Sequence, residues 1–147
     1  MTTPVVLWSV SGLDVVLAVF RAAMPDARFG TRRPDELPGV MPFAVVRRTG
    51  GSSPAPRFYD RLFCNVQCWA GEDRAAGVDA ARAAEVFADR CRRALWEAQQ
   101  AQTVTEHGWI CQLSESEGPE DTPDPGLPHH GRYVATYQLL VRRFPHS

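Results

Sequence analysis

The sequence contains no lysine, so all 16 basic residues among its 147 are arginine. This absence excludes a Schiff-base lysine, a lysine general base and a phosphate-binding loop that depends on lysine. The 17 acidic residues leave a net charge of −1. Such a balance is not typical of a strongly basic nucleic-acid binder or of an acidic disordered chain.

Long hydrophobic runs are also absent. The most apolar stretch, Val15 to Met24, is interrupted by Arg21 and is far shorter than the roughly 20 residues that a bilayer span needs. The first residues show no basic segment followed by an apolar run and a small-residue cleavage site. We therefore expect a protein that is made in the cytoplasm and has no membrane partner.

Recognisable catalytic motifs are missing as well. The sequence has no Gly-x-Ser-x-Gly elbow and no glycine-rich loop that leads into a helix. Glu115 and Glu117 would share one face of a strand, where a solvated edge is more typical than a catalytic carboxylate pair. His129 and His130 lie in a proline-rich segment, which favours a surface position over a metal or pH-sensing site. We expect neither an enzyme nor a cofactor.

Cysteine is scarce, with Cys64, Cys68, Cys91 and Cys111 as its only representatives. Four residues along a strand span roughly 13 Å, whereas a disulfide tolerates a Cα separation of at most about 7 Å. Cys64 and Cys68 should therefore point into the core as reduced thiols, and Cys91 falls on the apolar stripe of a helix. If the chain were an enzyme, zinc held by Cys64, Cys68, His107 and Cys111 would be its least unfavourable site.

Hydrophobic periodicity predicts two helices and four to five strands. Ser11 and Asp14 form a capping-box pattern at the start of a helix that Pro25 ends, and a longer alanine-rich helix covers about residues 73–100. Strands are expected near residues 27–31, 43–48, 58–70, 104–117 and 132–144. The order predicts a single α+β domain over residues 1–147, a mostly antiparallel sheet with both main helices packed on one face.

Two segments and one strand face are the candidate contact surfaces. The Gly/Ser/Pro segment after Arg48 and the proline-rich segment 118–131 should form irregular, flexible loops. Phe63 and Trp69 lie on the more polar face of their strand, so we expect a second subunit or the loops to cover them. The candidate interface residues are Gly50, Gly51, Phe63, Trp69, Pro119, Pro123, Asp124, Pro125, His129 and His130.

The order of these segments resembles the tail terminator, or tail completion, proteins of long-tailed bacteriophages with non-contractile, siphovirus-type tails. Trp69-Ala70 after the central strand and Arg132-Tyr133-x-x-Thr136 at the start of the last strand are the most specific features. The other features, which together span nearly the whole chain, are the opening helix, Pro42 to Arg48 with Gly50-Gly51, Asp60 to Ala70, Ala94-Leu95, Glu117 to Pro119, Pro123 to Pro125 and Arg132 to Leu139.

The resemblance implies a structural virion protein. Members of this family form a hexameric ring on the head-proximal end of the tail tube, halt tube polymerisation and join the tail to head-completion proteins. The implied partners are further copies of the chain, the major tail tube protein and a neck protein, and DNA passes nearby in the lumen. Because lysine is absent, any positive surface facing that DNA must consist of arginine.

Other functions remain compatible with the residues. A different neck component, such as a head-closure protein, and a tail-tube subunit are the nearest alternatives. A non-viral module that binds a peptide or a small ligand on its sheet would be a stable monomer with an open apolar groove. The zinc enzyme described above is the third class.

Overall fold

The computed structural model describes residues 11–34, 42–52, 55 and 58–144. The apolar residues Val5 to Trp8 lie outside the described residues, as do residues 35–41, 53–54 and 56–57 in the connections expected on either side of the strand near 43–48. No helix in the described ranges is long and apolar enough to cross a membrane.

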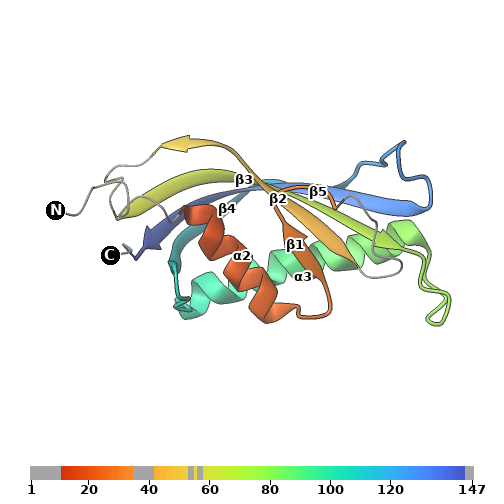
Figure 1. The fold of residues 1–147 in the computed structure, drawn as a ribbon, viewed down its shortest axis with the longest axis horizontal. Helices are drawn as coiled ribbons and strands as arrows, with labels where there is room; N and C mark the ends of the chain where they lie inside the picture. Colours follow the sequence, from red (N-terminus) through yellow and green to blue (C-terminus); the bar gives the residue numbers. More distant parts are fainter. Residues whose placement is uncertain (1–10, 35–41, 53–54, 56–57, 145–147) are drawn as a thin grey trace.

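The described chain folds into two helices and a five-stranded sheet, which confirms the α+β prediction. In chain order the elements are α2 (Gly12–Ala23), β1 (Arg28–Gly30), β2 (Phe43–Ser52), β3 (Tyr59–Gly71), α3 (Ala80–Ala101), β4 (Gly108–Asp121) and β5 (His130–Arg143). The long strands run along the longest dimension of the molecule (Figure 1).

The sheet has the order β1-β2-β3-β5-β4. The short β1 runs parallel to β2, and the other neighbouring strands are antiparallel. β3 and β5 form the centre and pair over their full lengths, from Tyr59 beside Arg142 to Gly71 beside His130. β2 and β4 flank this central pair, and β1 covers only the start of β2.

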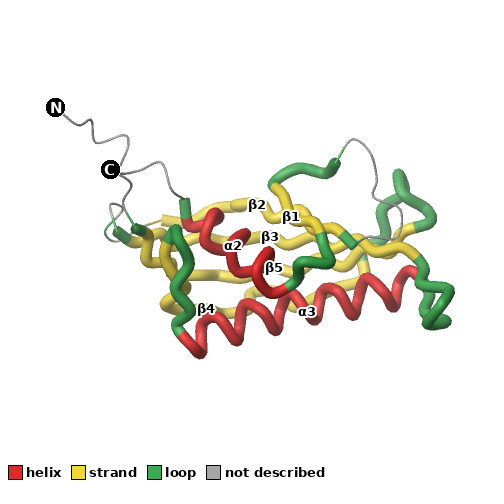
Figure 2. The backbone as a smooth tube through the Cα atoms, turned by 60° about the horizontal axis from the view of Figure 1, so that its bottom comes forward, coloured by secondary structure: helices red, strands yellow, loops and turns green. Residues whose placement is uncertain are grey.

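Both helices lie on the same side of the sheet (Figure 2). The alternation expected in β3 is confirmed, because Leu62, Cys64 and Val66 are buried beneath the helices. The alanine-rich stripe of α3 allows this helix to approach the sheet closely, and Leu95 is fully buried there. One large core on this face therefore unites α2, α3 and all five strands.

The N-terminus of α2 matches the predicted capping box. The Ser11 hydroxyl accepts a hydrogen bond from the backbone N–H of Leu13, and the Asp14 carboxylate accepts one from the N–H of Ser11 at 2.9 Å. Two of the unpaired N–H groups at the helix start are thereby satisfied. The helix ends at Ala23, directly before Met24 and Pro25.

The second helix starts later than predicted. α3 begins at Ala80, where the Asp79 side chain accepts a hydrogen bond from the N–H of Arg82 at 2.8 Å. The preceding residues form a tight turn closed by an isolated bridge between Asp73 and Val78, with Gly77 at a φ of +66°. Because a glycine readily adopts this left-handed conformation and Asp79 is a strong N-cap, the local residues favour a turn before the helix.

The two expected loops are shorter than predicted. β4 continues through Gly118 and Pro119 to Asp121, so only residues 122–129 connect it to β5. Proline is tolerated there because β4 is an edge strand whose outer N–H groups need no partner in the sheet. β2 likewise continues through Gly50 and Gly51 to Ser52, because a β-bulge between Arg48 and Gly50 keeps the strand paired with β3.

Candidate interaction surface

The side of the sheet that faces away from the helices is the outward face, and no helix covers it in the described part of the chain. On β3 and β5 this face carries side chains of mixed polarity that are mostly half-buried: Arg61, Phe63, Asn65, Gln67, Val134, Thr136, Gln138, Leu140 and Arg142. Neighbouring side chains are connected, since the Asn65 amide nitrogen lies 3.3 Å from Thr136 Oγ1 and Gln67 donates to Asn65 at 3.0 Å.

Phe63 is the most exposed aromatic side chain at the centre of this outward face. Its side chain is 37% exposed, and its cross-strand neighbour on β2 is Gly50. A Cβ atom placed on Gly50 would lie 3.8 Å from the Phe63 ring, so the missing side chain leaves the ring open toward the edge of the sheet. An exposed ring beside a glycine is suited to contact with another protein surface.

Trp69 is covered by the chain itself. It is only 3% exposed and belongs to a second small core with Phe43, Val45 and Leu127. Its ring stacks on Phe43 with the centroids 5.0 Å apart, and the Arg132 guanidinium lies over it at 5.6 Å. The sequence predicted that a second subunit or a loop would bury Trp69. In this chain a loop does so, through Leu127, and Trp69 is therefore not a surface residue.

Asp124 holds that loop in place. Its carboxylate accepts hydrogen bonds from the backbone N–H of Gly126 at 2.9 Å and from Trp69 Nε1 at 3.4 Å, and it pairs with Arg33 at 3.3 Å. The N–H of Gly126, the Trp69 indole and the nearby positive charges of Arg132 and Arg33 outweigh the effect of burial and lower the pKa of Asp124. The neighbouring Pro123 and Pro125 remain exposed.

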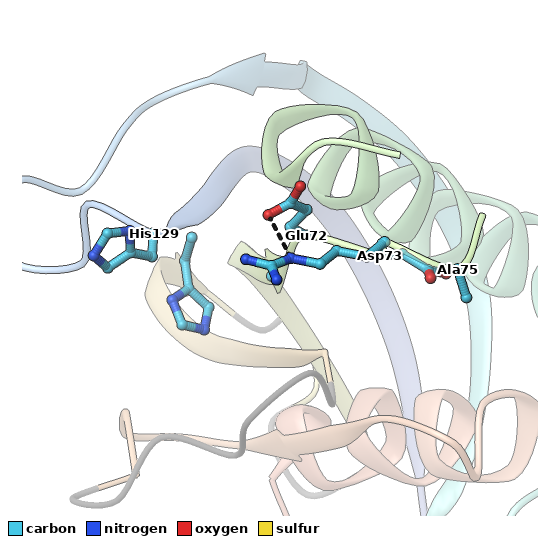
Figure 3. A pocket seen from close by; sticks show the side chains of 7 residues that line it. Glu72, Asp73, Ala75 and His129 are labelled. Atoms are coloured by element: carbon cyan, nitrogen blue, oxygen red, sulfur yellow. Dashed lines mark ion pairs between the residues drawn. The ribbon is translucent and has the colours of Figure 1, made fainter. Parts of the chain in front are cut away.

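His129 and His130 border an open hollow of about 730 Å³. Its opposite wall is the turn after β3, where Glu72 and Arg74 form an exposed ion pair at 3.5 Å (Figure 3). His129 is exposed, whereas His130 packs edge-on against Phe43. The described residues contain no group of three or more side chains that could hold a metal ion, so this hollow offers no metal site of that kind.

Gly51 is required by the backbone of β2. Its φ is +133°, and a Cβ atom there would lie 2.1 Å from the carbonyl oxygen of Arg61 on β3. Only glycine avoids that collision, because it lacks the side-chain atom. The Gly50-Gly51 pair therefore shapes the strand rather than a loop, and the half-buried Pro119 lies within β4, not in a loop as expected.

The zinc site considered for Cys64, Cys68, His107 and Cys111 is not assembled, because the part of the chain that the structure describes has no group of three or more side chains that could hold a metal ion. Cys64 is buried in the main core, and this burial raises the pKa of its thiol to about 12. Cys68 Sγ lies 3.8 Å from Cys91 Sγ on α3, and both are free thiols. Cys111 is half-buried on β4. The geometry confirms reduced core cysteines at Cys64, Cys68 and Cys91.

Glu115 lies elsewhere than the sequence predicted, and its ion pair was not expected. Glu115 pairs with Arg92 of α3 at 2.6 Å. A register shift in β4 separates Glu115 from Glu117, so Glu115 lies beside Tyr137 on the helix face and Glu117 beside Thr136 on the outward face. The two carboxylates therefore do not share a face. No alternation pattern could reveal this bulge, because it depends on the pairing with β5.

Comparison of the sequence with protein-family models and with curated proteins finds no match to either.

Proposed function

We propose that this chain is a tail terminator of a long-tailed bacteriophage, a ring-forming structural protein that caps the head-proximal end of the tail tube. The proposal rests on the resemblance of its motifs together with the α+β fold. Such a subunit needs lateral surfaces for its neighbours and two different axial surfaces, one for the tube and one for the neck.

One observation carries the proposal: the two candidate contact segments lie at opposite ends of the long sheet. The loop 122–129 follows β4 at the end where Gly71 pairs with His130. The connection after Ser52 begins at the other end, where Ser52 pairs with Arg61 (Figure 1). In a ring whose axis runs along the strands, one segment would face the tube and the other the neck.

This arrangement accounts for the arrest of tube growth. A ring of identical subunits related by rotation has two faces with different residues. The face that matches the open end of the tube binds it, and the opposite face does not reproduce the tube surface, so no further tube subunit adds. The opposite face is then available to the neck protein.

Two measurements test this function. Light scattering of the purified protein over a range of concentrations should detect a ring of about six copies, alone or after addition of tail tubes. Electron microscopy of purified tail tubes of the same phage, with and without the protein, should show capped ends and tubes that no longer elongate. Tubes that keep growing from both ends in excess protein would rule the terminator role out.

A further inference from the structure

The two long edges of the sheet carry opposite charge on the outward face. On one side, β1 covers β2 only over residues 43–45, so the outer edge of 46–52 has no strand partner in the described part of the chain. Arg47 is exposed on this edge. On the other side, β4 is the last strand of the sheet and exposes Glu117 and Glu120.

Arg47 and Glu117 lie at the two ends of one row of cross-strand pairs. Arg47 pairs across to Asn65 on β3, Asn65 pairs with Thr136 on β5, and Thr136 pairs with Glu117 on β4. Because directly opposed residues in antiparallel strands share a face, these four side chains form one row across the outward face. The row begins with a positive charge at one edge and ends with a negative charge at the other.

Neither terminal charge of this row has a partner in the described part of the chain. Among the described residues, no ion pair or hydrogen bond involves the Arg47 guanidinium or the Glu117 carboxylate. The neighbouring Arg48 differs, because Asp60 holds it in a bidentate pair at 2.6 Å. Arg47 and Glu117 are therefore available to a group outside this chain.

We infer that the β2 edge of one copy docks against the β4 edge of a second copy, with Arg47 beside Glu117 of its neighbour. β2 and β4 run in opposite directions because three antiparallel pairings separate them. Neighbouring copies with no shift along the strands would thus join two edges as an antiparallel pair, and the row of charges would continue from copy to copy. The contact gives the proposed ring a specific interface between subunits. The number of copies in the ring rests on the proposed function.

The same contact would cover the exposed edges of β2 and β4. Unpaired edges invite uncontrolled pairing with other chains, and a head-to-tail contact that closes by rotation removes both edges of every subunit. Register shifts after Ile110, Glu115 and Glu117 interrupt the regularity of β4. Side-chain pairing therefore has to select the partner at this edge, and opposite charges that are directly cross-strand suit that task.

Charge reversal tests the contact. Arg47→Glu and Glu117→Arg each place like charges side by side at every interface, so each variant alone should associate at least about tenfold more weakly in low salt. An equimolar mixture should recover the wild-type mass, because alternating copies restore an opposite-charge pair at both kinds of interface. The double variant Arg47→Glu/Glu117→Arg should recover it as well. Sedimentation velocity across concentration measures all four samples.

Glu97→Arg on α3 serves as the matched control for Glu117→Arg, since Glu97 is also exposed but lies on a helix. It should leave association unchanged. A wild-type chain that stays monomeric at about millimolar concentration overturns the contact. So does full association of the two single variants, or failure of the mixture to recover the wild-type mass.

The outcomes for the contact and for the proposed function can be distinguished. If the single variants associate normally and still cap tubes, the proposed function stands without this contact. If the mixture recovers the wild-type mass but no tube is capped, the contact stands and the proposed function is wrong.

Discussion

The two faces of the sheet place neighbouring residues in opposite environments. On β5, Leu139 is 1% exposed beneath the helices, whereas the next residue, Leu140, is half-buried on the outward face. On β3, Cys64 is buried and Phe63 beside it is exposed. The helix face thus holds most of the apolar surface removed from water, which stabilises the fold. Outside the small core around Trp69, the outward face contributes little to the stability of the isolated chain and is available for partners.

The sharpest test of this difference compares the two adjacent leucines. Leu139→Ala should lower the free energy of unfolding by about 3 kcal/mol, because it opens a cavity in a packed core. Leu140→Ala should lower it by less than about 1 kcal/mol, because water already reaches that side chain. Urea denaturation of both variants measures the two values. Equal losses would mean that the outward face is as important for folding as the helix face.

The next largest effect is expected in the backbone of β2, at Gly51. Gly51→Ala should destabilise the chain by about 2 kcal/mol, because the new Cβ atom would collide with the Arg61 carbonyl and the φ is positive. Gly77→Ala is the matched control, since its φ is also positive but no atom lies within 4 Å of the new Cβ. Gly77→Ala should lower the free energy of unfolding by about 1 kcal/mol. Thermal unfolding of both variants distinguishes a steric clash from backbone strain alone.

Local patterns were sufficient to predict much of the fold. The alternation of Leu62, Cys64 and Val66 identified the buried face of β3, and Ser11 with Asp14 identified the start of α2. These features depend on residues that are close in sequence, where side-chain period and capping chemistry decide the structure. The fold class followed from the order of such segments.

Features that depend on distant residues were not predictable. The cover of Trp69 comes from Phe43 and Leu127, and nothing near Trp69 in the sequence indicates either partner. The β4 bulge that separates Glu115 from Glu117 arises from pairing with β5. Pro119 suggested a loop because proline breaks most strands, but an edge strand accepts it. The row from Arg47 to Glu117 required the full strand order.

The pair of Asp60 and Arg48 lies on the helix face, where Arg48 is opposite the buried Cys64, and its loss should have an intermediate effect. Asp60 is 4% exposed and accepts hydrogen bonds from Arg48 and from the backbone N–H of Gly12 at the start of α2. Asp60→Asn should lower the free energy of unfolding by about 2 kcal/mol, because it removes the charge that faces a partly buried arginine. Asp26→Asn, which affects an exposed pair with Arg90, should lower it by less than about 1 kcal/mol.

The same carboxyl should make stability depend on pH. Burial alone would raise the pKa of Asp60, but the hydrogen bonds from Arg48 and Gly12 and the charges of Arg48 and Arg143 outweigh it and lower the pKa. The unfolded chain therefore binds the proton more readily. The stabilisation is present above the unfolded pKa of about 4 and is lost as the pH falls through the folded pKa. The acid decline in stability should be shallower in Asp60→Asn than in the wild type.

The smallest effect on stability is expected at Phe63, and it is the most informative for the outward face. Phe63→Ser should change the free energy of unfolding by less than about 1 kcal/mol, because water already reaches more than a third of this side chain in the isolated chain. It should nevertheless weaken the association of copies, since the ring lies beside Gly50 near the proposed contact. Phe144→Ser is the matched control, because Phe144 is also 37% exposed but packs against Trp109 at the end of β5. Equal loss of association in both variants would indicate general adhesion of apolar surface, whereas loss in Phe63→Ser alone would assign the effect to this edge of the sheet.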